Sequence, residues 1–203
     1  VAEACLGVKY DREPLIVGTS GRYEFKNKGL DVFVDSLLKL SEDDSLQRPV
    51  LAYVTVPAGN NGPRTMSITT PGISRKVITV GCSDDDREVL VGGNRMVDYS
   101  GRGPTLACIC KPDIVAPGTR ILSCNAFWKN RNGRIFKPYI AKSGTSMATP
   151  IVSGAAALVL QKYPRMSNEE FLRRVALTAT DLGEPWNKQG FGMLNVRRLL
   201  ENK

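Results

Sequence analysis

Residues 143–160 read SGTSMATPIVSGAAALVL, and this stretch constrains the fold more than any other part of the chain. Small and hydroxyl-bearing residues open it, and alanine, valine and leucine then appear on every side of a helical projection. A helix that is apolar all round is typical of a buried helix. We therefore predict a long buried helix over 145–163 that ends before Pro164, because proline does not continue a helix.

Short apolar runs precede this helix and indicate strands that are buried on both faces. They cover residues 50–56, 77–82, 114–115 and 120–124. Helical patterns lie between and after them, over 29–40, from a capping box at Ser167–Glu170 to about Ala179, and over 194–200. Strands that alternate with helices predict an α/β fold with a mostly parallel sheet covered by helices.

The composition fits one globular domain and excludes some classes of protein. The chain has 203 residues, a formal net charge of +8 and no apolar run long enough for a membrane span, so we expect no membrane partner. Residues 127–139, FWKNRNGRIFKPY, interleave basic and aromatic side chains, a pattern that can stack on single-stranded nucleic acid. The same segment fits a hairpin around Asn132–Gly133. We favour the hairpin and expect no nucleic acid partner.

The cysteines and aspartates do not form a recognisable metal or disulfide pattern. Five scattered cysteines are a poor disulfide framework, and Cys108-Ile109-Cys110 lacks the spacing of a redox pair. Three of them lie in apolar settings and are expected in the core. We interpret them as reduced thiols, which favours a cytoplasmic location. Residues 84–86, three aspartates, fit a solvated turn, so no metal and no cofactor are expected.

The chain contains no histidine. It cannot by itself supply an imidazole base to a serine or cysteine nucleophile. It also begins with Val1 rather than methionine and shows no secretory signal pattern. We therefore expect it to be part of a longer protein.

Ser146 is the first candidate for chemistry, because it follows Gly144 at the start of the buried helix. A helix N-terminus offers free N–H groups and a partial positive charge, which favour an oxyanion. The alternative is that Ser143, Thr145 and Ser146 only cap the helix with their hydroxyls. The pattern alone leaves both interpretations open.

Residues 58–62, AGNNG, follow the predicted strand at 50–56. In α/β sheets, sites form at the carboxyl ends of strands, and an asparagine amide there can donate to a developing oxyanion. The alternative is an ordinary Asn-Gly turn. Residues 99–105 and 111–122 form glycine- and proline-rich turns around a short strand, and composition gives them no function.

Taken together, these blocks resemble the subtilisin-like serine proteases, the subtilases. SGTSMATPIVSGAAAL resembles their nucleophile signature, and VPAGNNGP, VITVGC, YSGRGP…KPDIVAPG and GFGMLN resemble further family segments, in order over roughly residues 50–200. The resemblance is closest to bacterial intracellular-type subtilases. It implies a subtilisin-like doubly wound sheet, of which residues 1–203 are the carboxyl-terminal part of a single catalytic domain. The amino-terminal strands are then missing from this chain.

The resemblance also implies roles for individual residues. Ser146 is the expected nucleophile, and Asn60 the expected oxyanion donor beside the Ser146 backbone N–H. Ala58 and Gly59 are expected to form one wall of the pocket for the substrate side chain, and Gly18, in the nearest match to the family's Ser-Leu-Gly, belongs to the other. Gly144 and Thr145 are also expected to contact substrate. The substrate is a peptide or protein that binds as an extended strand.

Two family segments are absent from the sequence. The aspartate turn D-[ST]-G and the histidine segment H-G-T-H do not occur, so both catalytic partners are expected upstream of residue 1. The isolated chain is then expected to be inactive or nearly so, and to need the rest of the domain or a second copy. The alternative is a catalytically dead pseudoprotease that acts as a binding scaffold.

Overall fold

The computed structural model describes residues 15–20, 30–42, 50–85, 95–125, 137–164 and 166–201. Its main sheet contains β1 (Leu15–Ser20), β2 (Val50–Pro57), β3 (Ile78–Asp84), β4 (Arg95–Met96) and β5 (Ile114–Pro117). β1, β2, β3 and β5 run parallel, and the short β4 pairs antiparallel with the end of β3. The chain therefore has the α/β architecture with a mostly parallel sheet that its sequence predicts.

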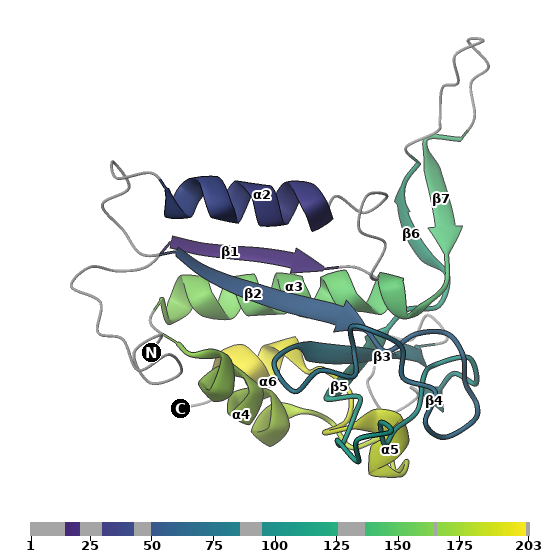
Figure 1. Cartoon of the computed structure of the whole chain (residues 1–203). Helices are drawn as coiled ribbons and strands as arrows, with labels where there is room; N and C mark the ends of the chain where they lie inside the picture. Colours follow the sequence, from purple (N-terminus) through teal and green to yellow (C-terminus); the bar gives the residue numbers. More distant parts are fainter. Residues whose placement is uncertain are drawn as a thin grey trace.

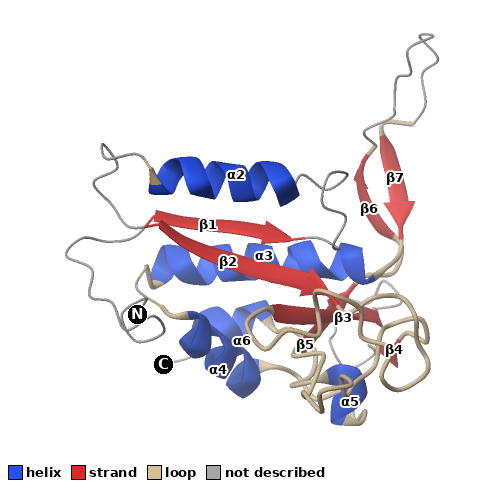
Figure 2. Ribbon diagram, in the orientation of Figure 1, coloured by secondary structure: helices blue, strands red, loops and turns tan. Residues whose placement is uncertain are grey.

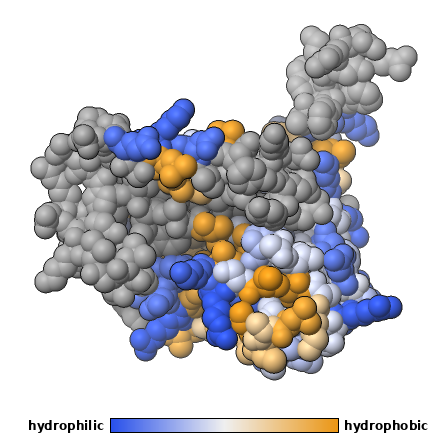
Figure 3. All heavy atoms as spheres, in the orientation of Figure 1, coloured by the Kyte–Doolittle hydropathy of each residue, from blue (hydrophilic) through white to orange (hydrophobic). Residues whose placement is uncertain are grey.

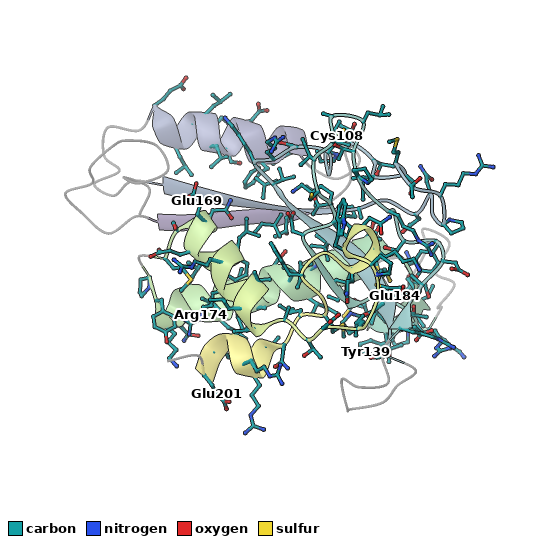
Figure 4. The ribbon with its side chains drawn as sticks, turned by 90° about the horizontal axis from the view of Figure 1, so that it is seen from below. Cys108, Tyr139, Glu169, Arg174, Glu184 and Glu201 are labelled. Carbon is teal, nitrogen blue, oxygen red and sulfur yellow. The ribbon has the colours of Figure 1, made fainter. Side chains whose placement is uncertain are left out.

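Helices pack around this sheet (Figure 1). α2 (Leu30–Ser41) lies beside β1, and α3 (Thr145–Lys162) runs along the strands on the other side and contacts β2, β3 and β5. α4 (Asn168–Thr178) and α6 (Val196–Glu201) follow near the carboxyl terminus. Arg174, labelled in Figure 4, joins these two helices, because its Nε donates to the Leu199 carbonyl at 2.7 Å.

The core lies between α3, the central strands and the carboxyl-terminal helices. Its fully buried members are branched aliphatic residues and one aromatic residue, and include Val80, Ile114, Val152, Val159, Phe171 and Leu199. The prediction that the long helix is buried on all sides is only partly right. Gly154 and Ala157 are exposed and Leu158 is 47% exposed, so one face of α3 is uncovered in the described structure.

Most predicted elements are confirmed to within two residues, and the capping box is present: Glu170 N–H donates to Ser167 Oγ, and Ser167 N–H to the Glu170 carboxylate, each at 2.9 Å. The sequence did not predict the strand β4 or the short helix α5 (Trp186–Gln189), and it showed only a weak apolar run where β1 lies. Asp84 ends β3 instead of opening a solvated turn, while Asp86 lies outside the described residues.

β6 (Ile121–Cys124) and β7 (Tyr139–Lys142) form a separate antiparallel pair. Figures 1 and 2 show that this pair projects away from the main sheet. Of the hairpin predicted over 127–139, residues 127–136, including the turn at Asn132–Gly133, lie outside the described residues. The described strands β6 and β7 flank this segment, so the hairpin within it stays a prediction.

The four cysteines that the structure describes are free thiols. Cys82 is buried, but Cys108, Cys110 and Cys124 are exposed. The expectation that three cysteines belong to the core is therefore wrong, because two of the apolar-looking segments are surface loop and projecting hairpin. Among the described residues, no helix is both long enough and apolar enough to cross a membrane.

Candidate active site

The candidate site forms where β2 ends and α3 begins. The turn after β2 carries Ala58, Gly59 and Asn60, and its first residue continues the sheet, because Ala58 N–H donates to the Val80 carbonyl at 2.8 Å. Ala58 and Gly59 are buried, whereas Asn60 is exposed. An amide at this point can therefore reach a molecule bound at the carboxyl edge of the sheet.

The glycine-rich segment after β4 fixes this turn. Gly101 N–H donates to the Gly59 carbonyl at 2.8 Å, and Gly62 N–H donates to the Tyr99 carbonyl at 3.0 Å. A Cβ on Gly101 would collide with the Ala58 carbonyl. Composition gave residues 99–105 no function, and the structure gives them one: they hold the backbone that presents Asn60.

Thr145 orients the side chain of Asn60. Asn60 Oδ1 accepts from Thr145 N–H at 3.0 Å and from Thr145 Oγ1 at 2.9 Å. Because both Thr145 groups are donors, the atom of the Asn60 amide that faces them is the acceptor Oδ1. The other atom, Nδ2, points away from Thr145 and can donate to another molecule. A Cβ on Gly144 would lie 3.2 Å from Nδ2, so glycine leaves room for the amide.

Ser146 is the second residue of α3 and is half-buried. Its backbone N–H has no acceptor within the helix, as is general for the first turn. No side chain caps α3: the cap position is Gly144, and the Ser143 hydroxyl instead accepts from Arg120 N–H at 2.9 Å. The interpretation that these hydroxyls only cap the helix is therefore wrong.

The backbone before Ser146 packs on a layer of buried and half-buried residues. Gly144 N–H donates to the Gly118 carbonyl at 2.9 Å. Beneath Gly118, Cys82 Sγ lies 3.2 Å from Tyr99 Oη, which lies 3.3 Å from Thr119 Oγ1. Burial raises the pKa of the Cys82 thiol. Burial and the hydrogen bond to Cys82 raise the pKa of Tyr99 to about 12. Both groups are therefore neutral near pH 7.

The structure brings together Asn60, Gly144, Thr145 and Ser146, with Ala58 and Gly59 in the adjoining turn. It does not bring Gly18 to this cluster, because Gly18 pairs with Tyr53, well before the end of β2. Thr145 is fully buried and contacts Asn60, and its expected contact with substrate stays a prediction. Ala58 is also fully buried.

Sequence reasoning missed the supporting residues Thr69 and Gly101. The Thr69 side chain occupies the space that a Gly59 Cβ would take, and Thr69 N–H donates to the Ala58 carbonyl at 3.0 Å. The dense glycines of residues 99–105 were the available signal for close backbone approach. Over the parts of the chain that the structure describes, no group of three or more metal-binding side chains occurs.

A mostly parallel α/β sheet thus places a serine at a helix N-terminus, next to an amide that Thr145 orients. Serine hydrolases use this combination of groups. The family follows from comparison: the Subtilase family model matches residues 20–193. The chain belongs to the subtilase family, whose members named below are serine proteases.

Several relatives show how much of such a protein this chain represents. It is 40% identical over 150 residues to serine protease AprX of Bacillus subtilis strain 168, covering 70% of this chain and 34% of AprX. It is 35% identical over 176 residues to subtilisin DY of Bacillus licheniformis, covering 83% of this chain and 56% of that protein. The chain thus spans between a third and just over half of these relatives.

Solved structures agree with this assignment. Fervidolysin from Fervidobacterium pennivorans, a keratinolytic enzyme related to subtilisin, matches with a TM-score of 0.56 and 26% identity, over 75% of this chain and 23% of fervidolysin. The prenylagaramide maturation protease PagA matches with a TM-score of 0.54 and 26% identity, over 84% of this chain and 55% of PagA.

Proposed function

We propose that this chain carries the nucleophile and the oxyanion donors of a serine endopeptidase. The observation that supports the proposal most is the pair of hydrogen bonds from Thr145 to Asn60 Oδ1, at 3.0 and 2.9 Å. They leave Asn60 Nδ2 as a donor beside the N-terminus of α3, where the Ser146 N–H is also without a helical acceptor. Two donors next to a hydroxyl are what acyl transfer requires.

In the proposed reaction, Ser146 Oγ attacks the carbonyl carbon of the scissile peptide bond. A bond forms between Oγ and this carbon, and the electron pair of the C=O bond moves to the oxygen. Asn60 Nδ2 and the Ser146 N–H donate to that oxyanion. The base that takes the proton from Ser146 Oγ passes it to the leaving nitrogen, so that collapse of the intermediate breaks the C–N bond, releases the amine and leaves an acyl group on Ser146. Water then hydrolyses this ester and restores the Ser146 hydroxyl.

A base must take the proton of the Ser146 hydroxyl, and in subtilases this base is a histidine. The 203 residues contain no histidine. We propose that residues 1–203 are the carboxyl-terminal part of one catalytic domain, and that the histidine and aspartate of the triad lie outside these residues. A serine without a general base reacts slowly. The isolated chain is therefore expected to acylate poorly, while the full-length protein is the active endopeptidase.

The substrate in this proposal is a peptide or protein bound in an extended conformation beside the turn at residues 58–60. Ala58 and Gly59 are buried in the described structure, and their part in the wall of the pocket stays a prediction from the family resemblance. Gly18 lies further back along β1, so the opposite wall is expected from residues nearer the carboxyl end of that strand.

Labelling with a fluorophosphonate probe tests the proposal. The full-length protein is expected to react at Ser146, and the Ser146→Ala variant not at all. Asn60→Ala is expected to reduce kcat by about 10²–10³-fold with little change in KM, a size known for subtilisins themselves rather than derived from this geometry. Fast labelling of the isolated 203-residue chain would show that the base is not missing, and unchanged turnover in Asn60→Ala would contradict its role.

The absence of histidine also fits a pseudoprotease that binds peptides without cleaving them. The same experiment separates the two functions. A full-length protein that binds peptide but neither reacts with the probe nor hydrolyses peptide is the binding scaffold.

A further inference from the structure

The β6–β7 pair is an exposed ribbon beside the candidate nucleophile. Leu122 is 68% exposed, Tyr139 57% and Ile140 40%, although apolar side chains of this size are usually covered. Figure 1 shows the ribbon standing away from the main sheet. Neither the sheet core nor the proposed reaction uses these side chains.

The pairing of the two strands separates the ribbon into two faces. Leu122 lies opposite Ala141, and Cys124 opposite Tyr139. Residues directly opposite each other share a face in an antiparallel pair, and alternate residues share it too. One face of the ribbon is therefore wholly apolar and exposed. The other face carries Ile121, Ser123, Ile140 and Lys142.

The segment that contains the ribbon has charges of one sign. Residues 120–142 include six basic residues and no acidic residue: Arg120, Lys129, Arg131, Arg134, Lys137 and Lys142. The net charge of the whole chain is +8, so this segment accounts for much of it. Figure 3 shows hydrophilic and hydrophobic residues side by side where the ribbon leaves the body of the protein. Exposed cations next to exposed apolar groups suit an acidic partner with apolar side chains.

The ribbon is joined directly to the site. β7 ends at Lys142, only a few residues before Ser146, and Arg120 N–H at the start of β6 donates to the Ser143 hydroxyl at 2.9 Å. Each strand has four residues, or about 13 Å at the usual rise. An extended polypeptide that passes Ser146 therefore reaches the ribbon within several residues of the bond to be cut.

We propose that the β6–β7 ribbon is a second contact surface for the polypeptide substrate and binds an acidic, partly apolar segment that flanks the scissile bond. The inference rests on the proposed endopeptidase function. Within the described residues each strand has no further strand on its outer edge, so the bound segment can pair with backbone groups there. Its acidic side chains then meet Lys137 and Lys142, and its apolar side chains the face of Leu122 and Tyr139.

The chemistry of the ribbon favours a polypeptide over a nucleic acid. Bases stack on aromatic faces, and the two described strands contain one aromatic residue, Tyr139, while Phe127, Trp128 and Phe136 lie in the segment outside the described residues. Leu122 and Ile140 are aliphatic, and a free strand edge suits an extended peptide backbone.

Binding to full-length Ser146→Ala protein tests the inference without catalysis. The probes are two fluorescent peptides of about twelve residues with the same apolar residues, one carrying glutamates and one glutamines at the same positions. The glutamate peptide is expected to bind roughly tenfold more tightly at low salt, with the difference shrinking as salt rises. Lys137→Gln/Lys142→Gln is expected to remove most of this preference, and Leu122→Ser/Tyr139→Ser to weaken both peptides.

The matched control is Lys39→Gln/Arg173→Gln, which removes two exposed cations from α2 and α4 and is expected to leave binding unchanged. Equal binding of the two peptides, or equal effects of the two charge variants, would overturn the inference. So would a single-stranded oligonucleotide that binds the ribbon more tightly than the glutamate peptide and loses this binding in Lys137→Gln/Lys142→Gln.

A second measurement separates this inference from the proposed function. In the protein with Ser146 intact, the ribbon variants are expected to cleave a substrate too short to reach the ribbon with unchanged kcat/KM, while kcat/KM for the glutamate peptide falls. If the short substrate is not cleaved at all, the endopeptidase proposal fails, and the binding assay still judges the ribbon.

Discussion

Thr145 shows how one buried hydroxyl can control an exposed amide. Its backbone N–H and its Oγ1 both donate to Asn60 Oδ1. Thr145→Val keeps the shape and the backbone donor but removes the hydroxyl, so Asn60 is held by one bond instead of two. We expect kcat of the full-length protein to fall by roughly three- to tenfold, as for loss of a net hydrogen bond of about 1 kcal/mol, with KM nearly unchanged.

Thr145→Ser is the control for this change, because it retains the hydroxyl and is expected to keep most of the activity. Equal losses in both variants would indicate that packing of the methyl group matters and that the hydroxyl does not position Asn60.

The pair of buried Cys82 and half-buried Tyr99 predicts a loss of stability at alkaline pH. Burial raises the pKa of both groups, that of Tyr99 from 10.0 to about 12, so the folded state holds their protons more tightly than the unfolded state. Their contribution is complete below the ordinary pKa values and is lost as the pH rises through the folded ones. Tyr99→Phe should flatten the fall in the urea midpoint between about pH 10 and 12. An equally steep fall in this variant would contradict the assignment.

At the scale of elements, the helices with a long periodic pattern or a capping motif could be predicted from the sequence, and the shortest elements could not. The long helix at 145–162 and the capped helix after Ser167 have strong periodic or capping signals, and both are confirmed. β4 has two residues and α5 has four, which is too short for periodicity to register. The bond between Thr145 and Asn60 joins residues 85 positions apart, so only the fold reveals it. The weak pattern before residue 20 likewise hid the register that separates Gly18 from the site.

Gly118 is closely surrounded by other atoms and Gly154 is not, so alanine substitutions at these two positions test how tightly the elements pack around Gly118. A Cβ on Gly118, between β5 and β6, would lie 2.5 Å from Cys82 Sγ and 2.8 Å from the Gly144 carbonyl. Gly118→Ala is therefore expected to displace the backbone before Ser146, to lower stability by about 1–3 kcal/mol and to slow fluorophosphonate labelling of the full-length protein.

Gly154 in α3 is the matched control, since a Cβ there meets nothing within 4 Å. Gly154→Ala is expected to stabilise the protein by about 0.5–1 kcal/mol, because alanine favours the helix, and to leave labelling unchanged. Chemical denaturation measures both changes. If both variants were equally stable, the crowding at Gly118 would not exist in solution.

For the whole molecule, the sequence predicted the sheet and the neighbourhood of Ser146 and Asn60, because both follow from local patterns in a known order. The basic residues of 127–139 are visible in the sequence, but the sequence did not predict that β6 and β7, which flank them, project from the main sheet. That position depends on which elements pack together, and no local pattern in residues 120–142 contains this information.

Lys111 connects distant parts of the molecule from a buried position. It is 2% exposed, and its Nζ donates to the Val77 carbonyl at 2.8 Å and to Asp113 Oδ2 at 2.6 Å. The same carboxylate oxygen accepts from Thr79 N–H at 2.7 Å, so the pair ties the segment before β5 to the start of β3. Removing one member of a buried pair leaves the other charge without compensation, which is costly.

Lys111→Met retains the length of the side chain and removes the ammonium group. We expect it to lower the free energy of unfolding of the full-length protein by about 3 kcal/mol, measured by chemical denaturation. Lys111→Met/Asp113→Asn should recover part of this loss, because it also removes the stranded carboxylate. Glu201→Gln breaks the exposed pair with Arg197, whose side chains are 84% and 63% exposed, and should cost less than about 0.5 kcal/mol. A loss in Lys111→Met as small as that in Glu201→Gln would show that the buried pair does not hold β3 and β5 together.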